Sequence, residues 1–244
     1  MDIMKTLFLI LALFTPFIAQ AEARLGVMGV ISETVYKDTD SKSTALPNIA
    51  YEGEHFFLRL PEIGYRFFPQ RSLQNFAVGL SYERAKFDPD NSDDINISML
   101  DDRDDSVMMF ANYRIGPIST KIAQDISGAH DGYYAQISAG FPVPVGAWKI
   151  IPSISYQYMD GKMSNHLFGT TQAESTLTSG AIAAYNTGSV SEVKYGLRGI
   201  YPLSRNATFI IGISHSRYDD KILQSPIVED NTITSLLAGL TYSF

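Results

Sequence analysis

The densest group of potential metal ligands in this chain is a run of aspartates between Phe87 and Asp105. The segment holds eight aspartates and one arginine, Arg103, a formal charge of −7 that equals the net charge of the whole chain. Carboxylates are the hard oxygen ligands that Ca²⁺ and Mg²⁺ prefer, but the spacing lacks the central glycine and terminal glutamate of an EF-hand loop. We favour a solvated outer loop and leave divalent-cation binding open. An alternative is that Leu100–Arg103 forms a turn in which Arg103 pairs with an aspartate.

The remaining residues with catalytic potential do not form a recognisable site. The four histidines (55, 130, 166 and 215) show no HxxxH or HExxH spacing, there is no cysteine, and no GxSxG element is present. In Ser214-His215-Ser216 the neighbours would point to opposite faces of a strand, so His215 could not activate either serine. We therefore predict no catalytic, cofactor-binding or metal-binding residues, and no enzyme. The negative charge also argues against nucleic acid as a partner.

The clearest element of the sequence is the last one, Thr232–Phe244. Its apolar residues alternate with small, mostly polar ones, which is the period of a β-strand with two different neighbours. The strand ends on an aromatic residue with no tail, as in the sorting signal of Gram-negative outer-membrane barrels. We therefore predict that Tyr242 and Phe244 form an assembly signal read by the barrel assembly machinery.

This prediction has a direct test. Deleting Phe244 should lower the amount of folded barrel in the outer membrane, because the terminal aromatic would no longer be available for recognition. The measurement is heat-modifiable mobility on gels, which distinguishes folded from unfolded barrel. Unchanged assembly would contradict the predicted role.

The start of the chain predicts export. Lys5 is followed by an apolar run, Thr6–Ile18, that is shorter than the ~20 residues a spanning helix needs, and Ala19-Gln20-Ala21 resembles a cleavage site. Residues 1–21 are predicted to be a signal peptide and residues 22–244 the mature domain. Later apolar runs are short and interrupted, so membrane insertion would require a closed barrel whose strands satisfy one another's backbone groups.

Alternation along the chain assigns the two faces of the predicted strands. In the strand around Leu197, the residues Val193, Tyr195 and Leu197 are predicted to face lipid. The charged residues predicted to face the lumen are Glu83, Arg114, Lys121, Asp125, Lys149, Glu192, Lys194 and Arg198. Opposite charges inside a small barrel are stable only if they pair, so we expect ion pairs across the lumen.

Connection lengths predict an all-β, antiparallel, up-and-down transmembrane barrel. Short connections alternate with long ones at Phe87–Asp105, Met159–Val190 and Asp219–Asn231, as in barrels with short periplasmic turns and long outer loops. The segment Pro47–Phe68 is difficult, because Gly53 and Pro61 interrupt it. We prefer one long bulged strand, which gives ten strands, because pieces of five or six residues are shorter than the ~9–11 residues that a spanning strand needs. The alternative is a split into three short strands, which gives twelve.

Several segments resemble the MipA/OmpV family. They include 48–54 (Asn-Ile-Ala-Tyr-Glu-Gly-Glu), Phe56–Arg59, Leu100–Arg103, the long segment Asn165–Tyr185, and Tyr218–Asp220 followed by Ser225–Val228. The resemblance implies an outer-membrane location. It also implies a scaffold that tethers a murein-cleaving lytic transglycosylase to a penicillin-binding protein, a role that brings no catalytic residues with it. Other members look like adhesins or porin-like proteins.

The expected function is therefore a scaffold in the cell outer membrane that contacts lipid, lipopolysaccharide and periplasmic murein enzymes. The predicted periplasmic turns are short, so a periplasmic partner should bind weakly. The alternatives are a narrow porin-like channel for small solutes and an outer-surface adhesin. Strand number bears on the choice, since barrels near eight strands are filled by side chains and wide pores need about sixteen.

Overall fold

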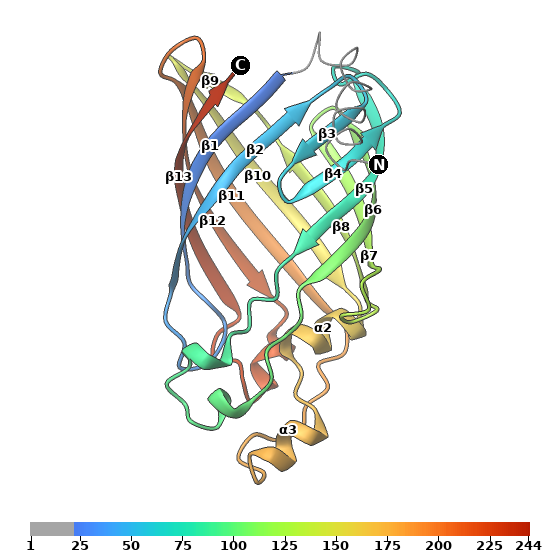
Figure 1. Cartoon of the computed structure of the whole chain (residues 1–244), viewed down its shortest axis with the longest axis vertical. Coiled ribbons are helices and arrows are strands. Elements are labelled where there is room, and N and C mark those ends of the chain that lie inside the picture. Colours follow the sequence, from blue (N-terminus) through green and yellow to red (C-terminus); the bar gives the residue numbers. More distant parts are fainter. Residues whose placement is uncertain (1–21) are drawn as a thin grey trace, which may run out of the picture.

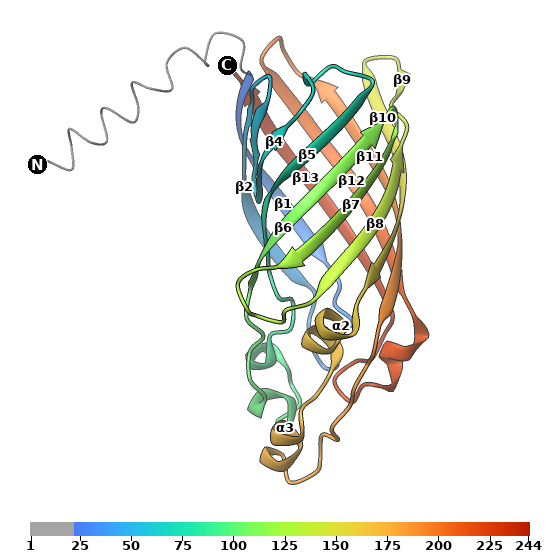
Figure 2. The same ribbon diagram turned by 90° about the vertical axis from the view of Figure 1, so that its right-hand side faces the viewer.

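A computed structural model describes residues 22–244 of the chain, and the predicted signal peptide, residues 1–21, lies outside the described residues. The described part is a single antiparallel sheet that closes into a barrel, with helical segments in the loops at one end (Figures 1 and 2). The strands are β1 (Glu22–Ser32), β2 (Lys42–Glu52), β3 (Phe56–Arg59), β4 (Glu62–Arg66), β5 (Gln74–Glu83), β6 (Ser106–Ile115), β7 (Ile118–Asp125), β8 (Tyr133–Gly140), β9 (Val143–Val145), β10 (Trp148–Met159), β11 (Val190–Pro202), β12 (Ala207–Tyr218) and β13 (Thr232–Ser243).

The barrel closes because the first strand pairs with the last. β1 lies between β2 and β13, and every other strand pairs with its neighbours in chain order, except that β10 bridges β8 and β11. Twelve strands form the wall; short β9 pairs only with β10, as a hairpin at the end where both described termini lie (Figure 2). Closure leaves no free sheet edge at the β1–β13 seam, which suits a wall surrounded by lipid.

The predicted single strand over Pro47–Phe68 is wrong. The chain turns twice there and gives β2, β3 and β4, so the barrel has the twelve strands of the alternative count. Leu60-Pro61 forms the tip of the β3–β4 hairpin, and Gly53 forms the turn between β2 and β3. β3 and β4, with four and five residues, are indeed too short to span a bilayer, but they do not have to span it. They complete the wall only near the short-turn end (Figure 1).

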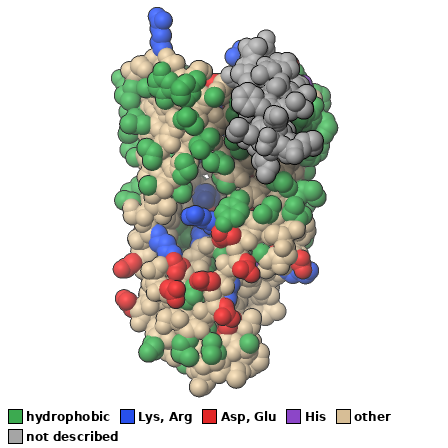
Figure 3. Space-filling view, viewed as in Figure 1, with side chains coloured by type: hydrophobic (Ala, Val, Ile, Leu, Met, Phe, Trp, Pro, Cys, Tyr) green, Lys and Arg blue, Asp and Glu red, His purple; other side chains and the backbone are tan. Residues whose placement is uncertain are grey.

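The outward face of the wall is apolar over most of its height. Leu25, Val27, Leu197, Ile213 and Leu240 are each about half exposed, on alternate residues of neighbouring strands. On the face seen in Figure 3, hydrophobic side chains (green) cover much of the upper part of the barrel, and most charged side chains lie below them. An apolar band of this extent is what a barrel presents to lipid, and the long loops below it mark the outer end.

The long loops pack together and cover the outer end of the barrel. They carry α2 (Gly161–Phe168), α3 (Gln172–Leu177) and the short 3₁₀ helices η2 (Pro89–Asn91), η3 (Ile97–Met99) and η4 (Asp220–Gln224). Residues from four separate loops, including Tyr36, Phe87, Phe168 and Ile227, form a buried core there. None of the helices in residues 22–244 is long and apolar enough to cross a membrane. Because the loops share this buried core, they form one folded cap over the end of the barrel.

Candidate functional site: a cavity in the outer half of the barrel

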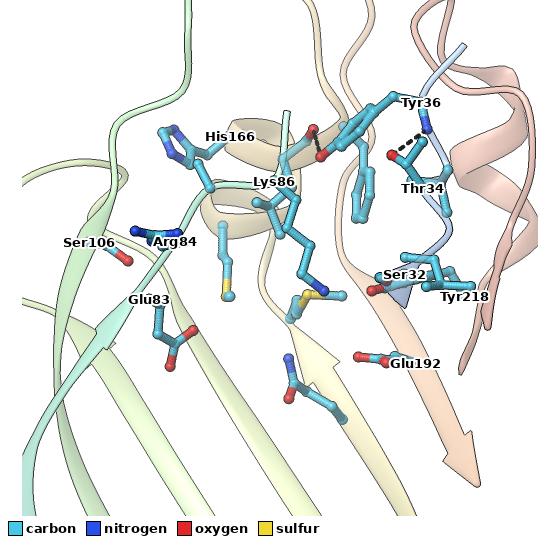
Figure 4. A pocket seen from close by; sticks show the side chains of 18 of the residues that line it. Ser32, Thr34, Tyr36, Glu83, Arg84, Lys86, Ser106, His166, Glu192 and Tyr218 are labelled. Carbon is cyan, nitrogen blue, oxygen red and sulfur yellow. Dashed lines mark hydrogen bonds between the residues drawn. The ribbon is translucent and has the colours of Figure 1, made fainter. Parts of the chain in front are cut away.

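A cavity of about 480 Å³ lies in the lumen, between the loop cap and the middle of the barrel (Figure 4). Its walls come from the outer ends of eight strands and from four loops, so residues far apart in sequence meet in it. Its charged lining includes Glu83, Lys86, Glu192 and Lys194, whereas its apolar lining includes Val35 and Met159. A volume in this range suits a small molecule, and a mixed lining of this kind can orient one.

Lys86 is the most unusual residue of the cavity. It follows the end of β5, and its side chain reaches down into the lumen (Figure 4). The side chain touches cavity solvent, yet protein surrounds it closely, and this burial, aided by the nearby Lys194 charge, lowers the pKa of Lys86. The carboxylates of Glu83 and Glu192 oppose the shift. Lys86 forms no ion pair or hydrogen bond with any residue in 22–244.

Helix α2 and the β1–β2 loop form the roof of the cavity. Asp160 begins α2 by accepting a hydrogen bond from the Met163 N–H, the usual role of an N-cap aspartate. The Tyr36 hydroxyl donates to the Leu167 carbonyl at 3.0 Å, and its ring lies against Phe87 and Phe168. These contacts attach α2 to two other loops, so the cavity does not open straight along the barrel axis into a wide mouth.

Arg103 and Glu174 connect the acidic loop to α3. The Arg103 Nη1 donates to Glu174 Oε1 at 2.7 Å, and Nη2 donates to the Gly169 carbonyl. The predicted pairing of Arg103 with an aspartate is therefore wrong, because its partner lies 71 residues further along the chain. Burial alone would raise the pKa of Glu174, but hydrogen bonds from Arg103 and from Thr171 hold it below its usual range.

Between the cavity and the short-turn end, aromatic rings and cations fill part of the lumen. Gly64 and Gly79 are paired residues of β4 and β5, and a Cβ on either would lie within 2.7 Å of the Phe57 or Phe110 ring. The two glycines thus leave room for rings that turn inward. Lys121 lies 4.5 Å from the Phe110 centroid and pairs with Glu62 at 2.7 Å. This cluster narrows the lumen on the β3–β7 side.

A second charged cluster lies closer to the short-turn end and is centred on Glu52. The Glu52 side chain is only 2% exposed and accepts hydrogen bonds from Arg59 and Arg66, the latter at 2.5 Å. Arg24 approaches the same carboxylate at 3.9 Å, and Arg66 also donates to the Gly53 carbonyl. One carboxylate therefore lies among three guanidinium groups inside the barrel.

The eight charged residues predicted for the lumen lie opposite the lipid-exposed side chains of their strands, but they do not form one network. Lys194 and Glu192 approach each other at 3.8 Å, and both line the cavity. Glu83 accepts a hydrogen bond from the Tyr134 hydroxyl at 2.9 Å. Lys149 and Arg198 are exposed near the short-turn end of β10 and β11, and Lys121 pairs outside the set, with Glu62.

The two remaining members stabilise turns instead of pairing across the lumen. Asp125, at the end of β7, accepts hydrogen bonds from the backbone N–H groups of Ser127, His130 and Asp131. Arg114 donates to carbonyls of the short turn at Gln70 and Ser72. The expected pairing of these charges with one another therefore occurs only for Glu192 and Lys194.

The other sequence candidates occupy separate places. Tyr242 and Phe244 are exposed and 5.0 Å apart at the short-turn end, where the Phe244 N–H bonds to the Ala23 carbonyl. His215 is exposed and contacts Thr234, whereas Ser216 is buried on the opposite face. No group of three or more potential metal ligands gathers within residues 22–244, the aspartate run Phe87–Asp105 included.

Sequence reasoning missed Lys86 and the Glu52 cluster for different reasons. Lys86 lies beyond the regular alternation of β5, and no local pattern predicts that a loop lysine turns inward. Glu52, Arg59 and Arg66 were hidden because the segment Pro47–Phe68 was taken as one strand, which left the faces of its residues unassigned. Once Gly53 and Pro61 are taken as turns, alternation from Phe57 places Arg59 on the inner face.

A closed antiparallel barrel with an apolar outer band, short turns at one end and a folded cap at the other defines an outer-membrane β-barrel protein. A family profile described as MltA-interacting protein MipA matches residues 25–244. The chain therefore belongs to the MipA family, as its resemblance to MipA/OmpV proteins predicted.

Individual relatives match along almost their whole length. The chain is 24% identical over 243 residues to the outer membrane protein YiaT of Escherichia coli K12, covering 96% of this chain and 98% of that protein. It is 23% identical over 234 residues to the MltA-interacting protein of the same strain, covering 93% of each. An outer membrane channel from Pseudomonas putida F1 aligns over 92% of this chain and 95% of its own, with 8% identity and a TM-score of 0.44.

Proposed function

We propose that this protein is a narrow pathway for small solutes, whose selective section is the cavity in the outer half of its barrel. The observation that carries the proposal is the solvent-reachable, charged cavity of about 480 Å³ beneath the loop cap. In a lumen that is closed by side chains, buried charges are expected to form ion pairs, as Glu52 does with Arg59 and Arg66. Lys86 instead extends unpaired into open space, where it can meet a solute.

The test uses the absence of cysteine in the chain. Gln157 lines the cavity, so Gln157→Cys places a single thiol there. The refolded variant should give a small conductance in planar bilayers, and a small methanethiosulfonate reagent should reduce that conductance. Ser43→Cys is the control: its side chain is exposed on the outer side of β2, so its modification should leave the current unchanged. An absence of current, or a current that does not change when the thiol in the cavity is modified, would rule out the pathway.

A second candidate is the tethering of murein enzymes. It is favoured by the name of the relative that is called MltA-interacting protein, and by the surface at the periplasmic end. There the β9–β10 hairpin extends with Val143 and Val145 exposed, next to the short turns. This surface is small, so the predicted contact is weak. Detergent-folded protein should enrich a lytic transglycosylase over Val143→Ser/Val145→Ser protein, and equal recovery would exclude this site.

A further inference from the structure

The barrel wall is interrupted beside β2, because the β3–β4 hairpin is too short to cover that strand. Of the residues of β2, only Ala50–Glu52 pair with β3. The last backbone hydrogen bond between β2 and the hairpin runs from the Leu60 N–H to the Ile49 carbonyl. From there to Lys42, β2 pairs with β1 but with no other strand in residues 22–244. At about 3.3 Å per residue, this leaves roughly 20 Å of strand edge uncovered.

The sequence of β2 fits an uncovered edge. Backbone groups of alternate residues point to the same side of a strand, and those of Gly53 and Ile49 point towards β3. The nitrogen of Pro47 must therefore point to the same side, into the gap. Proline has no N–H group, so at this position there is no donor to leave unsatisfied beside lipid. A proline here would remove a ladder bond if a neighbouring strand were present.

The gap is a bounded window rather than a broken seam. On the side of the short-turn end it is bounded by the Leu60-Pro61 hairpin tip, where the Pro61 carbonyl accepts a hydrogen bond from the Tyr82 N–H at 3.0 Å. Its far side is Arg84–Lys86, and at its outer end Lys42 forms an ion pair with Asp88. Figure 3 shows a hollow here, near the outer edge of the apolar band, with basic side chains in and around it.

The window leads to the cavity described above. Thr44 on β2 and Arg84 on the opposite side both line that cavity, so the lumen is continuous with this edge of the wall. Lys42, Arg84 and Lys86 place three cationic groups around the passage. The inward-facing Leu46 on β2 is 39% exposed, and Leu60 at the hairpin tip is 48% exposed. The window thus combines basic groups with apolar side chains at the level where a membrane leaflet meets its head groups.

We propose that the window admits, from the outer leaflet, an amphiphile with one acyl chain and an anionic head group, which binds with its head at Lys86. The proposal rests on the proposed function, in that it names a ligand and an entry route for the same cavity. Lys86 supplies an ammonium group without a counter-ion. The chain lies against Val35 and Met159, which line the cavity, and against Leu46 on the inner face of β2. The cavity volume accommodates a single-chain molecule and excludes a glycolipid with several chains.

The energetics of Lys86 agree with an anionic ligand. The protein around Lys86 makes its charged form less favourable and lowers its pKa, although the side chain stays accessible to solvent in the cavity. A carboxylate, sulfate or phosphate head beside the ammonium would offset that cost through a charge-assisted hydrogen bond. Glu83 and Glu192 remain available to exclude a second anion, so the site favours one head group with one negative charge.

The experiment uses dodecanoate carrying a photoreactive diazirine at its chain end, added to the full-length mature protein in nanodiscs. After irradiation, mass spectrometry locates the labelled residues. Label is expected on inward-facing residues such as Leu46 and Met159, and an alkyl trimethylammonium of equal length should label them at least about tenfold less. Label confined to outward-facing residues such as Leu197 would show binding at the lipid surface only and would overturn the proposal.

Two variants, each with a matched control, test separately whether the head group binds at Lys86 and whether the ligand enters through the window. Lys86→Gln should lower the cavity label by about tenfold, and Lys37→Gln, an exposed lysine outside the cavity, should not. Thr44→Trp should obstruct the window and lower the label similarly, whereas Thr120→Trp on the lipid face of fully paired β7 should not. All variants must first show wild-type heat-modifiable mobility. Unchanged label in Lys86→Gln or in folded Thr44→Trp would contradict the head-group site or the window, respectively.

Butyrate distinguishes this inference from the proposed function. It carries the same carboxylate but reaches the cavity from water. If butyrate protects Gln157→Cys from modification while dodecanoate labels only the outer surface, the solute pathway stands and the lipid route fails. If the thiol in the cavity has no effect on current while dodecanoate labels the cavity, the binding site stands and the solute pathway fails.

Discussion

Replacing Glu52 with alanine should destabilise the barrel by about 3–5 kcal/mol, the cost typical of leaving buried charges without their partner. Arg66 is almost as buried as Glu52, and its guanidinium group also donates to the Gly53 carbonyl and lies over the Phe57 ring. Without the carboxylate, the guanidinium groups of Arg24, Arg59 and Arg66 would repel one another in a confined space. The measurement is the free energy of unfolding in urea, for protein refolded in liposomes.

The control for this prediction is Glu62→Ala. Glu62 pairs with one cation, Lys121, and its side chain is 34% exposed, so water can replace the lost contact and the effect should be much smaller. A second control is the double variant Glu52→Ala/Arg66→Met, which should recover part of the lost stability, because a buried pair replaced by apolar groups leaves no unpaired charge. Equal effects of Glu52→Ala and Glu62→Ala would show that the cluster is not a structural centre.

The sequence predicted only some of the residues that face the lumen. Alternation predicts faces reliably where a strand is long, as in β11, where Glu192 and Lys194 line the cavity and Tyr195 is exposed outside. In Pro47–Phe68 the assumption that each strand must span the membrane outweighed the turn signals of Gly53 and Pro61. The same short hairpin leaves the edge of β2 uncovered, so the segment whose strands were predicted wrongly is also the one that forms the window.

The loop cap shows a different limit. Its helices carry local signals that were present in the sequence, such as the capping box of Thr171 and Glu174 at the start of α3. The contacts that hold the cap together carry no such signal. Arg103 reaches Glu174 across 71 residues, and the Tyr36 hydroxyl reaches the Leu167 carbonyl across 131. A single sequence contains no information on which distant loop a side chain will meet, so the roof of the cavity required the structure.

Leu197→Arg should cost about 2–4 kcal/mol of unfolding free energy, the penalty for a cation on the lipid face near the bilayer centre. Leu197 is 49% exposed on β11 and pairs with Ile213 on β12, within the outward apolar band. An arginine there would displace lipid contacts, and it is too far from the head groups to reach them without distorting the bilayer. Urea titration of liposome-inserted protein again gives the free energy.

The matched control lies three residues earlier on the same strand. Lys194 faces inward, so Lys194→Met removes a charge from the water-accessible cavity and should change stability by well under half as much as Leu197→Arg. Because faces alternate residue by residue, a register error of one position would exchange the two results. A large loss of stability in Lys194→Met together with a tolerated Leu197→Arg would therefore refute the register of β11, and with it the assignment of Glu192 and Lys194 to the cavity.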